Sequence, residues 1–145
     1  MEGKFNMYPT KKQILAQLPT IKESTLKIVL AWKDGLWSQL KTKEEPDKLE
    51  ALQALLLTLA ASYDKPLIGV HVTNRDSSHY KPEKKTIHLK NPQSIISALH
   101  ELAHHLYGSS ELKACKWSIA LFKRTFPISY SQLEWQGHML VRKKL

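Results

Sequence analysis

The sequence has a single cysteine, Cys115, among its 145 residues. One cysteine excludes a disulfide within the chain and a zinc site built mainly from thiolates. Glycine and proline are also scarce, at 5 and 7 residues, which excludes a collagen-like or low-complexity chain. The longest apolar-rich stretch, residues 49–62, is too short to span a membrane. Because the first residues also lack the apolar run of a secretory signal, we expect a cytoplasmic protein without a membrane segment.

The composition is that of one globular domain with an excess of positive charge. Hydrophobic residues make up 42% and charged residues 24% of the chain, and the formal net charge is +9. Residues 112–145 contain seven lysines and arginines against one acid, Glu134, which amounts to +6 of that total. Two interpretations of this excess are open: a solvated basic surface, or a contact with nucleic acid through the basic C-terminal region.

The first half of the chain is predicted to be helical. Residues 10–40 contain apolar residues at helical spacing in two short stretches. The polar residues 41–46 end in proline and resemble a linker, after which leucines recur on one face of a helix over residues 47–64. We therefore expect an N-terminal helical extension, residues 1–46, and a main domain, residues 47–145, that together form one compact unit.

Two short β-rich segments follow this helix. Residues 67–73 are rich in β-branched residues, and residues 85–89 alternate polar and apolar side chains. The segment between them is polar and typical of turns. Both segments are therefore predicted to be strands of a small sheet.

The second half of the chain is predicted to return to helices. Residues 92–107 form an amphipathic helix, and a second helix, capped by Ser109 or Ser110, ends at Pro127. Residues 129–145 are weakly helical at best. This order of elements predicts an α+β fold, in which the 47–64 and 92–107 helices pack on a small twisted sheet.

The residues that indicate chemistry are His100-Glu101-Leu102-Ala103-His104, an H-E-x-x-H pattern on the 92–107 helix. Residues at i and i+4 lie on one face of a helix, so both imidazoles can reach one ion. Zinc prefers nitrogen ligands at this spacing, and it lowers the pKa of its water towards 7. Glu101 then lies where it can take a proton from that water. The pattern predicts His100 and His104 as Zn²⁺ ligands and Glu101 as the general base.

A catalytic zinc ion needs a third protein ligand and an open fourth position. Glu111 follows His104 by seven residues, after a break at Gly108, and would lie in the first turn of the next helix. A carboxylate is favoured there by the helix dipole. Three histidines remain as alternatives that sequence alone does not place: His71, His79 and His138.

The helix with the H-E-x-x-H pattern resembles the active-site helix of the zincin metallopeptidases. The run from Glu111 through Ala114 and Trp117 to Phe122 is similar to the glutamate helix of the gluzincins, especially of the ImmA/IrrE-like group. The SprT-like proteases are a more distant likeness. In the ImmA/IrrE-like group Asp or Asn is common at the position of Cys115.

This resemblance implies a zincin-like metallopeptidase that hydrolyses protein or peptide substrates. It implies His100, His104 and Glu111 as zinc ligands and Glu101 as the general base. It also implies an edge strand that pairs with extended substrate, formed by Thr86, Ile87, His88 and Leu89. Two alternatives stay open: a nucleic-acid- or partner-binding module with a structural or vestigial zinc site, and a latent peptidase whose cleft is plugged by the C-terminal segment with His138.

Overall fold

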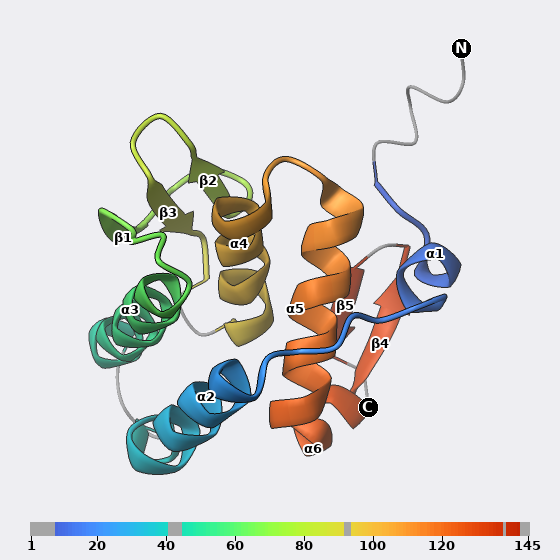
Figure 1. The fold of residues 1–145 in the computed structure, drawn as a ribbon, viewed down its shortest axis with the longest axis horizontal. Coiled ribbons are helices and arrows are strands. Elements are labelled where there is room, and N and C mark those ends of the chain that lie inside the picture. The colour runs from blue at the N-terminus through green and yellow to red at the C-terminus, as the bar shows by residue number, and fades with distance from the viewer. Residues whose placement is uncertain (1–7, 41–44, 92–93, 138, 143–145) are drawn as a thin grey trace.

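The chain combines helices with two small sheets in an α+β arrangement (Figure 1). The computed structural model describes residues 8–40, 45–91, 94–137 and 139–142. In chain order the elements are α1 (Lys11–Leu15), α2 (Glu23–Gly35), the short 3-10 helix η2 (Trp37–Leu40), α3 (Glu45–Ser62), β1 (Gly69–Val72), β2 (His79–Lys81), β3 (Thr86–Leu89), α4 (Ile95–Tyr107), α5 (Glu111–Thr125), α6 (Pro127–Ser131), β4 (Leu133–Gln136) and β5 (Met139–Arg142).

The larger sheet has three strands in the order β1-β3-β2. Strand β1 runs parallel to β3, and β2 runs antiparallel to it. Helices α3 and α4 lie against one face of this sheet (Figure 1). On that face Val70, Ile87 and Leu89 are buried, because alternate residues of a strand point to the same side. The other face carries polar side chains.

Capping residues define the short turn between α4 and α5. The hydroxyl of Ser94 accepts a hydrogen bond from the Ser97 amide at the start of α4. Gly108 ends α4 with φ at +98°, a conformation that side chains with a Cβ rarely adopt. Two residues later Ser110 caps α5 through the Lys113 amide. The chain therefore reverses within three residues and brings Glu111 back beside α4.

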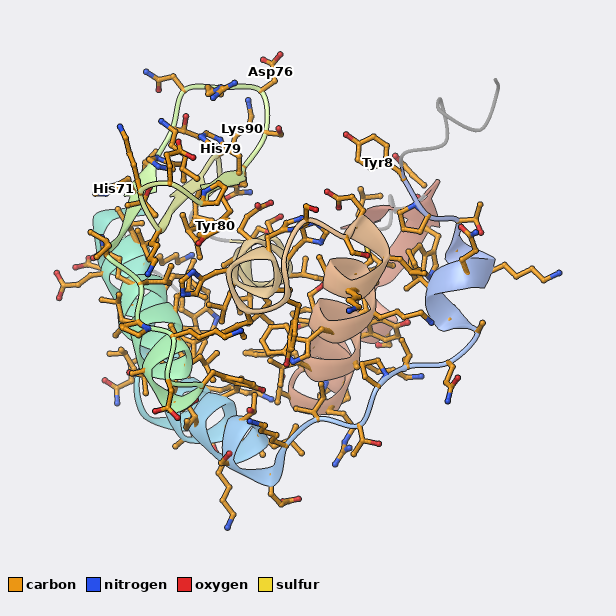
Figure 2. The ribbon with its side chains drawn as sticks, turned by 45° about the horizontal axis from the view of Figure 1, so that its top comes forward. Tyr8, His71, Asp76, His79, Tyr80 and Lys90 are labelled. Carbon is orange, nitrogen blue, oxygen red and sulfur yellow. The ribbon has the colours of Figure 1, made fainter. Side chains whose placement is uncertain are left out.

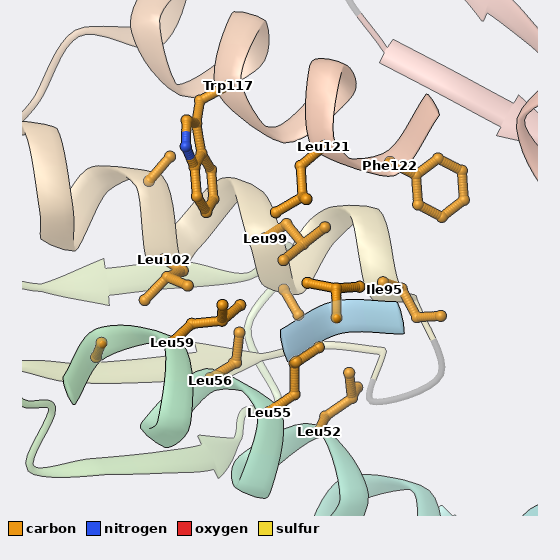
Figure 3. Close-up of a cluster of buried hydrophobic side chains, with 14 of the residues drawn as sticks. Leu52, Leu55, Leu56, Leu59, Ile95, Leu99, Leu102, Trp117, Leu121 and Phe122 are labelled. Atoms are coloured by element: carbon orange, nitrogen blue, oxygen red, sulfur yellow. The ribbon is translucent and has the colours of Figure 1, made fainter. Parts of the chain in front are cut away.

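The main core lies where α3, α4 and α5 meet (Figure 3). The side chains that fill it are aliphatic and aromatic, and each helix contributes one face. The central members are Leu52, Leu55, Leu56, Leu59, Leu99, Leu102, Trp117 and Leu121.

The N-terminal helices pack on the same body. Residues of α2 belong to the main core, and the indole Nε1 of Trp32 donates to the Ala51 carbonyl over 2.8 Å. Helix α1 packs on α5, where Ile14 is buried against Cys115 and Ile119. The Nζ of Lys116 donates to the backbone carbonyl of Gln17, just past the end of α1, over 2.7 Å. The expected extension thus shares its buried contacts with the rest of the chain.

The helical predictions are largely confirmed, and three predictions need correction. Helix α3 begins at Glu45, so the expected linker is shorter, and residues 41–44 lie outside the described residues. The segment expected to be all turn contains β2, and residues 129–145 contain the β4–β5 hairpin in place of a weak helix. Both missed pairings depend on a partner strand, which periodicity within a short segment does not reveal.

No helix in the described part of the chain is long and apolar enough to cross a membrane. Helix α3 is the longest of the described helices, with 18 residues, and it carries polar residues such as Glu50 on its exposed face.

Truncation of Leu56 is expected to destabilise the protein strongly. Leu56 is 0% exposed in the core, and removing a buried leucine side chain leaves a cavity that costs about 2–5 kcal/mol of unfolding free energy. Leu57, its neighbour on α3, is 40% exposed. Urea denaturation should therefore show a much smaller loss of unfolding free energy for Leu57→Ala than for Leu56→Ala. Equal losses would contradict the packing of α3.

Candidate metal centre

Helix α4 presents His100 and His104 from adjacent turns. Their ring centroids are 4.9 Å apart and the ring planes are nearly perpendicular, at 82°. The opposite face of α4 is buried in the core through Leu99, Leu102 and Leu106. The apolar face therefore anchors the helix, and the histidine face is turned towards α5.

Glu111, in the first turn of α5, faces both histidines. Its Oε1 lies 2.9 Å from the Nε2 of His100, and its Oε2 lies 3.2 Å from the Nε2 of His104. The turn at Gly108 makes this contact possible, because α5 starts beside the end of α4. Glu111, proposed from its spacing in the sequence, is thus brought together with both predicted ligands.

The orientation of the His104 ring is set by the backbone. Its Nδ1 donates to the carbonyl of Gly108 over 2.9 Å, so Nε2 is the nitrogen that faces Glu111. Hydrogen bonding to Glu111 raises the pKa of His104, and the Gly108 contact adds to this effect. Hydrogen bonds from His100 and His104 in turn hold the pKa of Glu111 well below its usual range. Without metal, protons shared by this cluster hold the donor atoms together.

The two contacts of Glu111 with the histidines have separations close to those of neighbouring zinc ligands. Two donors at tetrahedral angles, each about 2.05 Å from zinc, lie about 3.3 Å apart. The two contacts of Glu111, at 2.9 and 3.2 Å, are close to this separation. Two imidazoles and one carboxylate are also a donor set typical of catalytic zinc. In the part of the chain that the structure describes, the possible ligand atoms that lie within 4.8 Å of one another belong to His100, Glu111 and Cys115, and His104 is outside that group. Binding of one ion by His100, His104 and Glu111 would therefore require the His104 ring to move closer.

Cys115 lies behind His100, where its Sγ is 3.9 Å from Nδ1. Among the described residues, His100, Glu111 and Cys115 also form a group whose possible ligand atoms lie within 4.8 Å of one another. However, Glu111 contacts the Nε2 of His100 and Cys115 contacts its Nδ1. One ion can coordinate only one of these two ring nitrogens. Burial raises the pKa of the Cys115 thiol to about 12, which favours the neutral thiol. Cys115 contacts His100 on the side of the ring opposite to Glu111.

Glu101 is buried beside the two histidines, with 8% of its surface exposed. Burial raises its pKa to about 7, although the neighbouring His100 and His104 act in the opposite direction. A carboxyl group with this pKa exchanges a proton near neutral pH, as a general base must. Glu101 lines a cleft of about 390 Å³ together with His104 and Glu111.

The raised pKa of Glu101 predicts how the stability of the metal-free protein depends on pH. Between pH 4.5 and 7 the unfolded chain ionises Glu101 while the folded chain keeps it protonated, so the folded state binds more protons and stability falls as pH rises. The loss attributable to Glu101 is on the order of 3 kcal/mol. Urea denaturation in EDTA should therefore show that the unfolding free energy decreases less between pH 4.5 and 7 for Glu101→Gln than for the unchanged protein. Parallel pH curves for the two proteins would contradict a raised pKa.

The opposite wall of the cleft is formed by β2 and its flanking residues. Ser78, His79, Tyr80 and Pro82 line it. Figure 2 shows Tyr80 on the α4 side of the sheet, where its hydroxyl donates to the Nδ1 of His105 over 2.7 Å. The Nε2 of His105 donates in turn to the carbonyl of Lys65 over 2.6 Å. His105 therefore ties the cleft wall to α4, and both of its ring nitrogens are used away from the metal centre.

The predicted substrate-binding strand is not at the edge of the sheet. It is β3, the central strand, and it pairs with β1 on one side and β2 on the other. The edge prediction is wrong because β2, which sequence reasoning missed, takes the position beside the cleft. An extended peptide cannot pair with the residues assigned to it: Thr86, Ile87, His88 and Leu89.

Of the alternative third ligands, two lie on the sheet and one is not described. His71 and His79 lie on β1 and β2, where their rings contact His88. Neither belongs to the group of possible metal ligands within 4.8 Å of one another in the described residues, which consists of His100, Glu111 and Cys115. His138 lies outside the described residues, so the plug expected from the C-terminal segment stays a prediction. The residues that line the cleft all lie between Ser78 and Glu111.

No family model matches this chain, and neither a curated protein nor a solved structure matches it. The likeness to zincin metallopeptidases consequently depends on the H-E-x-x-H helix and the glutamate helix that follows it. The geometry of Glu111 against His100 and His104 is the structural observation on which any function for this centre depends.

Proposed function

We propose that the protein is a zinc-dependent metallopeptidase of the gluzincin type. The observation that carries this proposal is the contact of both Glu111 carboxylate oxygens with the Nε2 atoms of His100 and His104. Three protein donors leave a fourth position for water or substrate, as hydrolytic zinc sites require. The adjoining cleft gives a substrate access to Glu101.

Zinc, when bound, supplies a Lewis acid that polarises a carbonyl and makes water a nucleophile near neutral pH. Glu101 accepts the proton that this water loses as it attacks the scissile peptide bond. It then delivers the proton to the amine that leaves. Its burial suits both steps, because a carboxyl with a pKa of about 7 takes up and releases a proton at similar cost.

Strand β2 is the segment that an extended substrate would contact. It lies at one edge of the sheet and borders the cleft. Within the described residues β2 pairs only with β3, so its other edge can accept a further strand. A peptide added there would run beside Glu101 and Glu111 and gain backbone hydrogen bonds independent of its sequence. His79, Tyr80 and Lys81 thus replace the β3 residues as the proposed substrate contact.

The test is metal content and metal-dependent hydrolysis of the purified full-length chain. We expect about one zinc ion per chain. We also expect cleavage of fluorescein-labelled casein that stops with 1,10-phenanthroline, a zinc chelator, and returns when zinc is added. Zinc binding without cleavage of casein or of a random peptide library would favour a structural metal site. Absence of zinc binding would reject the metal centre altogether.

A further inference from the structure

Three histidines form a row across the face of the sheet that α3 and α4 leave open. Strand register pairs His71 with His88 and His88 with His79, so one histidine comes from each strand. The rings of His79 and His88 are stacked, with centroids 4.8 Å apart, and His71 lies 5.4 Å from His88. Figure 2 shows His71 and His79 on the side of the sheet away from α4.

The backbone at Gly69 makes room for this row. A Cβ placed on Gly69 would come within 2.9 Å of the Nε2 of His71, so the ring lies over the glycine. On the neighbouring strand the Nε2 of His88 contacts the Thr86 hydroxyl over 2.8 Å. The Nε2 of His79 is buried and has no hydrogen-bond partner among the described residues. The rings therefore form an ordered layer whose hydrogen bonding within the protein is incomplete.

Cations without an ion pair in the described residues lie on both sides of the row, towards the two ends of the strands. Lys81 and Lys84 are near enough to His88 to lower its pKa. Arg75, in the β1–β2 connection, and Lys90, at the end of β3, lie at the other end of the strands. None of these four side chains, nor that of Lys85, forms an ion pair within the described part of the chain.

We propose that this open face of the sheet, through the histidine row and its flanking cations, binds the phosphate backbone of single-stranded nucleic acid. A narrow stripe of positive charge that follows the strands suits a flexible chain with one negative charge per nucleotide. Apart from the histidines, the strand residues on this face are Gly69, Thr86 and Lys81, so the contact is with phosphates and is independent of base sequence.

The row makes this binding dependent on pH. Burial lowers the pKa of His88. The neighbouring groups that lower it further are Lys81, His79, His71 and Lys84. His88 is therefore largely neutral at pH 7.5, where the lysines and arginine carry the binding. Glu83, in the β2–β3 turn, and Asp76, in the β1–β2 connection, are the acids of the same segment. A bound phosphate favours the charged imidazole of His88, so affinity rises as the pH falls towards the lowered pKa of His88.

The test is fluorescence anisotropy of labelled oligodeoxythymidine with the full-length protein at several salt concentrations. We expect a micromolar Kd in 50 mM NaCl and a log–log salt slope of about −3.5 for five phosphate contacts. Affinity should rise about tenfold between pH 7.5 and 6.0. The triple change of Arg75, Lys81 and Lys84 to Gln should reduce the slope by about 2.

The matched control removes equal charge elsewhere, by changing the exposed Lys11, Lys12 and Lys27 of α1 and α2 to Gln. Equal weakening in this control would overturn the proposal, because net charge alone would then explain the binding. His71→Gln, at an exposed position, and His71→Gln with His88→Gln should both reduce the pH dependence, and each fold is checked by circular dichroism. A pH dependence that survives in these folded variants, or tighter binding of a poly-glutamate peptide of equal charge, would also overturn it.

Discussion

Glu101→Gln is expected to lower kcat for peptide hydrolysis by about 10³-fold while zinc stays bound. Glutamine keeps the shape of the buried side chain but cannot accept a proton. The zinc ligands proposed for the site, His100, His104 and Glu111, are unchanged. Turnover of labelled casein by zinc-loaded protein gives the rate, and atomic absorption gives the metal content.

The control for this change is Glu50→Gln, which removes an exposed carboxylate on α3 far along the chain from the cleft. Its kcat should equal that of the unchanged protein. Two results would reject the role of Glu101: full activity in Glu101→Gln, or loss of zinc together with activity. The second result would mean that Glu101 holds the metal centre together in place of acting on a proton.

Glu111→Ala is expected to weaken zinc binding by more than about 100-fold. Loss of a residue that merely supports a ligand costs about 10–100-fold in metal affinity, and Glu111 is proposed as a ligand itself. Its carboxylate meets both imidazoles, so its removal also leaves His100 and His104 without the partner that holds them together. Competition with a chromophoric chelator measures the change in Kd.

Cys115→Ala provides the comparison that identifies the ligand set. Because Cys115 contacts the far nitrogen of His100, its loss should weaken zinc binding less than the loss of Glu111. If Cys115→Ala releases zinc while Glu111→Ala keeps it, the ion binds through the thiolate side of His100. That result would replace His104 and Glu111 as the proposed ligands.

The proximity of His100, His104 and Glu111 could be predicted from the sequence because it depends on local geometry. The i and i+4 spacing places His100 and His104 on one face of a helix whatever surrounds it. Gly108 and Ser110 are the residues expected where one helix ends and the next begins, and the turn between them places Glu111. The contact of Cys115 with His100 was not predicted, although Cys115 follows Glu111 by one helical turn of α5.

The sheet was less predictable because its strands depend on distant partners. Strand β2 has three residues, and only its register with β3 makes it a strand. Because β2 occupies the edge of the sheet, β2 and not β3 is the strand that could pair with a substrate. The β4–β5 hairpin was missed for the same reason, although Leu133 and Trp135 alternate with polar residues and Gly137, with φ at +65°, is a hairpin-turn residue.

The short interval between the ligands has a consequence for the order of folding. His100 and Glu111 are 11 positions apart, and the two helices that carry them follow each other directly. Closing so small a loop has little entropic cost and takes far less than a millisecond. In a growing chain, residue 111 and the first turns of α5 leave the ribosome before the β4–β5 hairpin does, so the proposed zinc ion could bind before that hairpin forms. The ion would then act as a folding nucleus that joins α4 to α5, and zinc starvation would slow the maturation of the protein as well as its activity.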